Sequence, residues 1–225
     1  RKELEEGVHR LLFVSPEMLL GGSLLGFIRS LSIRAVAIDE AHCISQWGHD
    51  FRTEYRQLAA LRDFLPGISI HACTATATPR VRDDIVHQLQ LRNPQVMVGS
   101  FDRPNLTYRI RPRENRKKQL LEEVRRHAGE AIIIYALSRR DTEQISEGLS
   151  SNGVSVAHYH AGLTRQERNR VHDAFAREQL DVVVATVAFG MGIDRSNVRA
   201  VIHASMPRSV EHFQQETGRA GRDGD

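Results

Sequence analysis

Two series of apolar runs alternate with helical patterns along the chain, and this alternation constrains the fold more than any other feature. In the first series, near-continuous runs of Ile, Val, Leu and Ala predict strands at residues 11–14, 33–38, 68–72 and 96–98. The patterns between them predict helices near residues 16–29, 53–64 and 79–89. Strands of this kind, apolar on both faces and separated by helices, form parallel sheets that helices cover.

Turn-forming residues at 99–105 end the first series and predict a linker. The second series predicts strands at residues 106–110, 131–135, 155–157, 181–185 and 200–203, and helices near residues 115–127, 138–152 and 164–177. We therefore expect an α/β fold with two lobes, residues 1–100 and 101–225, each a mostly parallel sheet covered by helices. Flavodoxin-like and dehydrogenase domains produce the same pattern, so the motifs must distinguish between these folds.

The composition is that of an ordinary globular protein. The 225 residues are 40% hydrophobic, and no apolar run approaches the ~20 residues that a membrane-spanning helix needs, so we expect no membrane partner. Cys43 and Cys73 stand apart without metal-ligand spacing, which predicts free thiols and a reducing, cytoplasmic location. A net charge of +3 permits a polyanionic partner without requiring one.

Two carboxylates, Asp39 and Glu40, directly follow the apolar run at residues 33–38. Nucleotide-hydrolysing α/β domains place a magnesium ligand and a water-orienting base at the end of a buried strand. Asp39 is therefore a candidate Mg²⁺ ligand, with Glu40 acting through water. Taken alone, the same pair can equally be a helix cap or a solvated turn.

The next residues, 43–52, read CISQWGHDFR, and together with Asp39-Glu40-Ala41-His42 they resemble the RecQ family of DNA helicases. In that family an aromatic-rich loop after the carboxylate motif senses single-stranded DNA. The resemblance makes Gln46, Trp47, His49, Phe51 and Arg52 its candidate residues. Base stacking on an aromatic side chain contributes roughly 1–3 kcal/mol per base and tolerates any sequence. The alternative, that the aromatic residues anchor a core, is disfavoured by the neighbouring Gly48 and Asp50.

The resemblance continues in order along the chain. Residues 73–78 resemble helicase motif III, although Thr78 before Pro79 also suits a helix cap. Residues 137–139, 159–163 and 184–194 resemble motifs IV, IVa and V; Leu137 and Asp194 stand where the family commonly has Asn. The resemblance implies that DNA contact or coupling falls to Thr74, Thr76, Ser138, Arg139, His160 and Thr186, and nucleotide contact to His42, Gly190, Gly192 and Asp194.

Residues 214–224 resemble helicase motif VI and carry Gln215, Arg219 and Arg222 as candidate catalytic residues. Because the two Arg are three residues apart, a helical turn would direct both to one side. An Arg that neutralises charge on a transferred phosphoryl group accelerates hydrolysis by about 10³ to 10⁵. The alternative is an exposed basic turn.

Taken together, the resemblance implies two RecA-like lobes that close on ATP and Mg²⁺, and movement 3′ to 5′ along one strand of DNA. Its partners would be single-stranded and partly duplex DNA, with a single-stranded-DNA-binding protein as a further candidate. In a bacterium we expect the protein to be cytoplasmic and nucleoid-associated.

The resemblance does not cover a whole helicase. The sequence contains no G-x-x-x-x-G-K-[ST] phosphate loop, and both ends of the chain look cut. We therefore expect an incomplete first lobe and little ATP hydrolysis by this chain alone. Two alternatives are a superfamily 2 RNA helicase, which the loop at residues 47–52 disfavours, and a non-catalytic nucleic-acid-binding module, which the presence of Asp39, Glu40, Arg219 and Arg222 disfavours.

Overall fold

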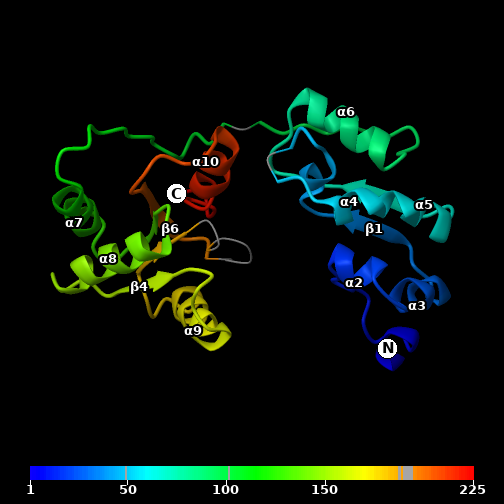
Figure 1. Cartoon of the computed structure of the whole chain (residues 1–225), viewed down its shortest axis with the longest axis horizontal. Helices are drawn as coiled ribbons and strands as arrows, with labels where there is room; N and C mark the ends of the chain where they lie inside the picture. Colours follow the sequence, from blue (N-terminus) through cyan, green and yellow to red (C-terminus); the bar gives the residue numbers. More distant parts are fainter. Residues whose placement is uncertain (49, 101, 187–188, 190–194) are drawn as a thin grey trace. The chain divides into compact units, whose positions relative to one another are not determined.

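The computed structural model describes residues 1–48, 50–100, 102–186, 189 and 195–225. The chain forms two compact units, residues 1–99 and 100–225, and the boundary lies one residue before the expected one. The elements of each unit are shown in Figure 1. None of the helices in the described part of the chain has the length and apolar character needed to span a bilayer.

Unit 1 contains a two-stranded parallel sheet of β1 (Ala35–Ile38) and β2 (Ser69–Ala72). One face of this sheet packs in the core through Val36, Ile38, Ile70 and Ala72, whereas the other face is exposed, so the expectation of strands covered on both faces is wrong for unit 1. The helices of the unit are α1 (Lys2–Glu5), α2 (Pro16–Leu20), α3 (Leu24–Ser30), η1 (Ala41–Ile44), α4 (Thr53–Arg56), η2 (Gln57–Ala60), α5 (Leu61–Phe64) and α6 (Pro79–Gln88). All of these helices except α1 contribute apolar side chains to one core, in which Ala41, Ile44 and Leu89 are completely buried. Because Gly21 caps α2 and helix formation is unfavourable at Gly, the helix expected at 16–29 is divided in two.

Three expected strands are absent from the described structure: residues 11–14, 96–98 and 106–110 do not pair with any strand. Their large apolar side chains are mostly exposed, as at Phe13, Met97 and Ile110. A strand needs a neighbour to satisfy its N–H and C=O groups, so an apolar run without one remains irregular. The helix expected at 53–64 is likewise wrong in detail, because it consists of α4, η2 and α5.

Unit 2 is built on a four-stranded sheet in the order β4-β5-β3-β6, and every pairing is parallel. Its strands are β3 (Ala131–Tyr135), β4 (Val156–Tyr159), β5 (Val182–Ala185) and β6 (Val198–His203), and its helices are α7 (Arg116–Arg126), α8 (Arg139–Ser150), α9 (Arg165–Ala176) and α10 (Val210–Thr217). The α/β fold with parallel sheets covered by helices is thus confirmed.

The central strand β3 is buried on both faces of the sheet. Ile132 and Ile134 pack in one core cluster with residues of α7 and α8, whereas Ile133 packs in another with Val171 and Phe175 of α9. This follows from the two-residue period of a strand, which directs successive side chains to opposite faces. The two helical layers are visible on either side of the sheet (Figure 1).

Replacing Ile133 with Ala should destabilise unit 2 by about 2–5 kcal/mol, because it leaves a cavity between β3 and α9. Ile133→Val should cost only about 0.5–1.5 kcal/mol. Urea unfolding followed by circular dichroism measures both changes. Ile110→Ala is the control, because Ile110 is 99% exposed; an equal effect of the two Ala variants would contradict the assignment of the core.

Candidate functional site

Asp39 and Glu40 form a tight turn where β1 ends. The Glu40 amide donates to Asp39 Oδ1 at 2.8 Å, which orients the exposed Asp39 carboxylate. Glu40 has φ of 50° and ψ of 40°, a left-handed conformation that costs a non-glycine residue free energy. The turn leads into η1, whose four residues are all buried. The Asp39 carboxylate therefore faces solvent from a rigid segment, and the Glu40 carboxylate is partly buried beside it.

His42 connects this turn to the segment after β2. Its Nδ1 lies 2.9 Å from Thr74 Oγ1 and 3.4 Å from Glu40 Oε2. The Thr74 hydroxyl donates to the Thr76 carbonyl at 3.2 Å, so its oxygen accepts from His42, and the His42 ring carries a proton on Nδ1. The ring is almost fully buried, with its side chain 3% exposed. His42 thus links Glu40, the candidate general base, to Thr74 in the segment that resembles motif III.

The Cys43 thiol packs against the other side of this histidine, with Sγ 3.6 Å from His42 Nε2 and 3.9 Å from Asp50 Oδ2. Burial, and after it the Asp50 carboxylate, raises the pKa of Cys43 to about 11. The protonated Cys43 thiol can donate to His42 Nε2, because that nitrogen carries no proton when the ring proton is on Nδ1. Cys73, by contrast, is exposed, and both cysteines are free as expected.

The loop after η1 presents its aromatic residues to solvent. Trp47 is 58% exposed, and the Arg80 guanidinium carbon lies 3.3 Å from its ring centroid. Gly48 is required by close packing, because a Cβ there would lie 2.3 Å from the His42 carbonyl oxygen. The loop closes where the Arg52 amide donates to the Cys43 carbonyl at 2.9 Å. A cation on one face of Trp47 leaves an exposed indole suited to stacking.

The remaining loop candidates are also accessible. Gln46 and Phe51 are exposed, and Arg56 lies over the Phe51 ring at 5.9 Å. Arg52 Nη2 binds Asp50 Oδ2 at 2.8 Å, an ion pair that a phosphate could compete for. The core interpretation of Trp47 and Phe51 is therefore wrong. His49 lies outside the described residues.

In unit 2 a cavity of about 320 Å³ opens at the carboxyl edge of the sheet. It is lined by Leu137, Ser138, Arg139, Ala161, Thr186, Arg208 and His212. The sequence predicted Ser138, Arg139 and Thr186 but missed Arg208 and His212. Both missed residues follow β6, so the rule that functional side chains gather at the carboxyl ends of parallel strands could have found them. Two Arg and a Ser suit an anionic ligand.

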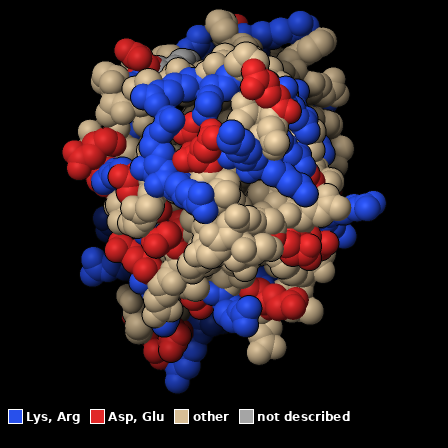
Figure 2. Space-filling model, turned by 90° about the vertical axis from the view of Figure 1, so that its left-hand side faces the viewer, with Lys and Arg blue, Asp and Glu red and all other residues tan. Residues whose placement is uncertain are grey.

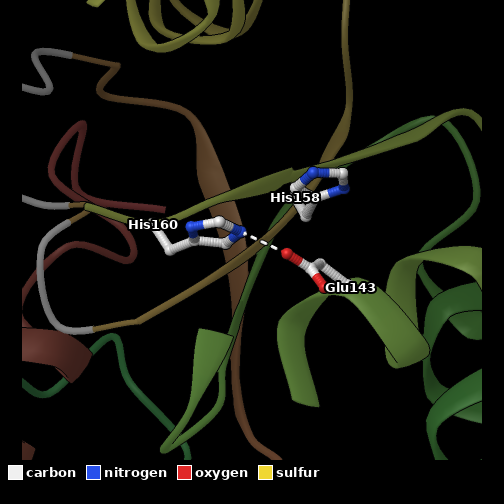
Figure 3. Close-up of side chains that lie close together, drawn as sticks. All are labelled: Glu143, His158 and His160. Atoms are coloured by element: carbon white, nitrogen blue, oxygen red, sulfur yellow. Dashed lines mark hydrogen bonds and ion pairs between the residues drawn. The ribbon is translucent and has the colours of Figure 1, made fainter. Parts of the chain in front are cut away.

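His160 lies beside this cavity but is directed toward α8 (Figure 3). The Gly162 amide donates to its Nδ1 at 3.2 Å, so Nε2 carries the ring proton and donates to Glu143 Oε1 at 3.0 Å. His158 stacks on the His160 ring, with centroids 5.5 Å apart. The bonds therefore make His160 a clamp between β4 and α8.

Glu143, His158 and His160 offer ligand atoms within 4.8 Å of one another, a spacing that a metal ion could draw together. However, a metal ion on His160 Nε2 would need the ring proton on Nδ1, where it would face the Gly162 amide hydrogen. The arrangement in Figure 3 therefore favours a proton between His160 and Glu143 over a metal ion.

The candidate motif VI lies at the end of α10. The helix stops at Thr217, and Arg219 and Arg222 lie in the turns that follow, so the expectation that a helical turn aligns them is wrong. Gly221, with φ of 56°, ends the helical path between them. Gln215 lies on the last turn of α10, and Arg222 is exposed.

A polar pair between β6 and α10 holds that helix against the sheet, and a buried hydroxyl of β3 binds a different segment. His203 Nε2 donates to the buried Glu216 carboxylate at 2.7 Å, and the Tyr135 hydroxyl donates to the Phe189 carbonyl at 2.9 Å. Burial raises the pKa of Tyr135 to about 12, an effect that the nearby Arg219 charge opposes. Arg219 is thus adjacent to a phenol that stays neutral at physiological pH.

The turn between Arg219 and Arg222 is also tied to the start of unit 2. Arg103 Nη2 donates to the Ala220 and Gly221 carbonyls at 3.0 and 2.7 Å, and Asn105 Nδ2 donates to Gly221 at 2.9 Å. Added atoms would not fit, because a Cβ on Gly221 would lie 2.5 Å from Asn105 Nδ2. The predicted linker residues therefore have a structural role that sequence reasoning did not assign.

Part of the predicted nucleotide site lies outside the described residues. Gly190, Gly192 and Asp194 lie outside the described residues. Thr186 is described, and its amide donates to the Tyr159 carbonyl at 3.2 Å. Thr76 is buried, and its hydroxyl has no hydrogen-bond partner among the described residues.

Comparison with known proteins identifies similar sequences over the whole chain. Residues 115–224 match the helicase conserved C-terminal domain. The chain is 49% identical over 223 residues to the ATP-dependent DNA helicase RecQ of Pasteurella multocida, covering 99% of this chain and 35% of that protein. It is 43% identical over 222 residues to the protein of the same name from Bacillus subtilis, covering 98% of this chain and 38% of that protein.

A solved structure shows the same fold at low sequence identity. Dbp5 of Saccharomyces cerevisiae, bound to RNA and ADP BeF3, aligns with a TM-score of 0.71 at 20% identity, over 93% of this chain and 56% of that one. This similarity supports a RecA-like α/β fold for the chain. The chain spans little more than a third of the two RecQ relatives.

The two cysteines should differ sharply in reactivity. At pH 8 iodoacetamide should alkylate Cys73 and leave Cys43 unmodified, because Cys43 is buried and burial raises its pKa to about 11. Mass spectrometry of the intact chain should show one adduct, and Cys73→Ser should show none. Two adducts on the folded protein would contradict the packing of Cys43 against His42.

Proposed function

We propose, from the premise that this chain is RecQ-like in sequence along 98–99% of its length, that it is part of an ATP-dependent DNA helicase. The motor would move 3′ to 5′ along one strand and unwind duplex DNA in recombination and repair. Its DNA would be single-stranded or partly duplex.

The observation that carries this proposal is the position of His42. One buried ring contacts Glu40 and Thr74, and the next residue, Cys43, holds the Arg52 end of the aromatic loop. If a nucleobase bound to the loop and shifted it, the movement would therefore reach Glu40, the candidate general base, through a few contacts. Hydrolysis that depends on bound DNA requires such a connection.

The residues of the turn fit magnesium. Asp39 is an exposed carboxylate with one oxygen fixed by the Glu40 amide, and hard oxygen ligands of this kind suit Mg²⁺ with its remaining waters. Mg²⁺ would neutralise phosphate charge when bound. Glu40 would orient the attacking water and accept its proton, and His42, whose Nδ1 lies 3.4 Å from Glu40 Oε2, would limit the movement of that carboxylate.

Arg219 and Arg222 would stabilise charge on the transferred phosphoryl group, with Gln215 beside them. The tethering by Arg103 and Asn105 favours this role, because a catalytic Arg acts only from a fixed position. Gly190, Gly192 and Asp194 would contribute nucleotide contacts, as the resemblance implies.

The cavity of unit 2 would contact the DNA backbone. Arg139 and Arg208 supply positive charge there, and Ser138 and Thr186 supply hydroxyl groups. Trp47, His49 and Phe51 would sense bases, with Gln46 and Arg52 as polar contacts and Thr74 and Thr76 transmitting the signal. His160 would support this surface as a clamp, rather than through contact.

An RNA helicase of the same superfamily is the second candidate function. The structural relative Dbp5 is bound to RNA. Sequence identity of 43–49% to proteins named as DNA helicases favours DNA. We also propose a single-stranded-DNA-binding protein as a partner, and a cytoplasmic, nucleoid-associated location in a bacterium.

The catalytic assignment can be tested in a chimera, in which this segment replaces the matching segment of the Pasteurella multocida relative. Single-stranded DNA should stimulate its ATP hydrolysis, and Glu40→Gln should lower the stimulated rate by about 10² to 10⁴, the usual contribution of a general base. A coupled phosphate-release assay measures both. Stronger stimulation by RNA, or an undiminished rate in Glu40→Gln, would contradict the proposal.

The coupling role of His42 predicts a separate effect at Thr74. In the same chimera Thr74→Val should reduce the ratio of DNA-stimulated to basal hydrolysis about two- to twelvefold, because the hydrogen bond that it removes contributes roughly 0.5–1.5 kcal/mol. Thr74→Ser is the matched control, since it keeps the hydroxyl and should retain the ratio. If both variants behave alike, the methyl group of Thr74 matters rather than the hydrogen bond.

A further inference from the structure

Residues 109–126 carry more positive charge than the whole chain. They contain eight Lys and Arg and three Glu, a net charge of +5, whereas the net charge of the chain is +3. The rest of the chain is therefore net negative. The charge is concentrated on one extended segment and on the helix that follows it, α7.

Half of these cations have no ion-pair partner among the described residues: Arg109, Arg113, Lys117 and Arg125. All four are exposed, and residues 107–115 are exposed without interruption. We call these four residues the basic strip. The others have structural partners, as when Arg116 forms a bidentate pair with Asp141 at 2.6 and 2.9 Å, joining α7 to α8.

The start of α7 breaks a rule that the other helices of unit 2 obey. Its first turn holds Arg116, Lys117 and Lys118 and no acidic residue, whereas α8, α9 and α10 each begin with an Asp or Glu in the first turn. Cations at a helix N-terminus oppose the helix dipole and destabilise the helix. An anion bound there would interact favourably with both the dipole and the cations.

Figure 2 shows the face of the molecule that carries α7 and α8. Lys and Arg side chains gather there in a broad band around a smaller acidic group. A surface of this kind attracts a polyanion over several contacts rather than a single small ion.

We propose that the basic strip, Arg109, Arg113, Lys117 and Arg125, binds the phosphate backbone of DNA as a second contact, separate from the residues that line the cavity. The contact is independent of base sequence, because phosphate groups carry no sequence information. The proposed function suggests DNA as the polyanion, but binding at the strip does not require ATP hydrolysis.

The test uses the 225-residue chain as it is. Fluorescence anisotropy measures its affinity for a labelled 20-base-pair duplex and for the single strand, between 50 and 200 mM salt. In the strip variant, all four residues of the basic strip are replaced with Gln. We expect about tenfold or greater loss of duplex affinity. The salt dependence should become shallower by about 0.9 for each phosphate that the strip no longer neutralises, up to about 3.6.

The matched control removes the same charge from unit 1, at Arg10, Arg29, Arg34 and Arg92. These four are exposed and have no ion pair in the described part of the chain. The control variant should keep the affinity and the salt slope of the parent chain. Equal loss in the two variants would overturn the proposal, because net charge alone would then explain it; so would wild-type affinity in a strip variant whose circular dichroism shows a folded chain.

Two further arms separate this proposal from its alternatives. Arg139→Gln with Arg208→Gln alters the cavity, and if only this variant loses DNA binding, the strip is not a contact. If the strip variant instead loses binding to phosphatidylserine vesicles but not to DNA, the polyanion is a membrane, and the proposal fails. Failure of DNA-stimulated hydrolysis in the chimera would overturn the proposed function and leave this result unaffected.

Discussion

Parallel strand pairing is the constraint on which the rest of the structure depends. Because β3 pairs in parallel with β5 and β6, and β4 with β5, all four strands of unit 2 end at the same edge. The two strands of unit 1 obey the same rule. Polar residues that follow different strands are thereby collected without any direct sequence proximity. Thr186 and Arg208, which follow β5 and β6, line one cavity for this reason.

Burial on both faces makes that edge rigid. Ile132, Ile133 and Ile134 are completely buried, and helices cover both sides of β3. Polar groups near the edge can then be held in fixed orientations by a few hydrogen bonds, as His160 and His203 are. His42 is held by a hydrogen bond in the same way beside the smaller sheet of unit 1. In a buried site each such bond is costly to leave unmade, so it specifies one arrangement rather than merely adding stability. The three histidines differ in partner but share this role.

The sequence predicted the central parts of the fold better than its margins. All six strands were found within two residues of an expected run. For β3 and β5 the continuous Ile and Val pattern reflects burial on both faces, whereas alternate residues of β1 and β2 are exposed. Residues 11–14, 96–98 and 106–110 have a similar pattern, but a strand also needs a partner, which local sequence does not reveal. The same limit applies to the site. The types and order of residues predicted Asp39, Glu40, Ser138, Arg139 and Thr186 as site residues, whereas Arg208, the Arg80 contact with Trp47 and the tethers of Gly221 depend on distant contacts.

The places where local rules are broken coincide with segments to which the proposed function assigns a role. Gln90 and Glu178 have positive φ just after α6 and α9, where helices commonly end in this conformation, but Glu40 has it between a strand and η1. That strain, of order 1–3 kcal/mol, holds a carboxylate beside His42. Thr76 buries a hydroxyl, and α7 places cations at its positive end. Folding alone favours none of these features. Since the surrounding core stabilises each unit enough to tolerate them, they mark where interaction with a nucleotide or a polyanion would recover the free energy that they cost.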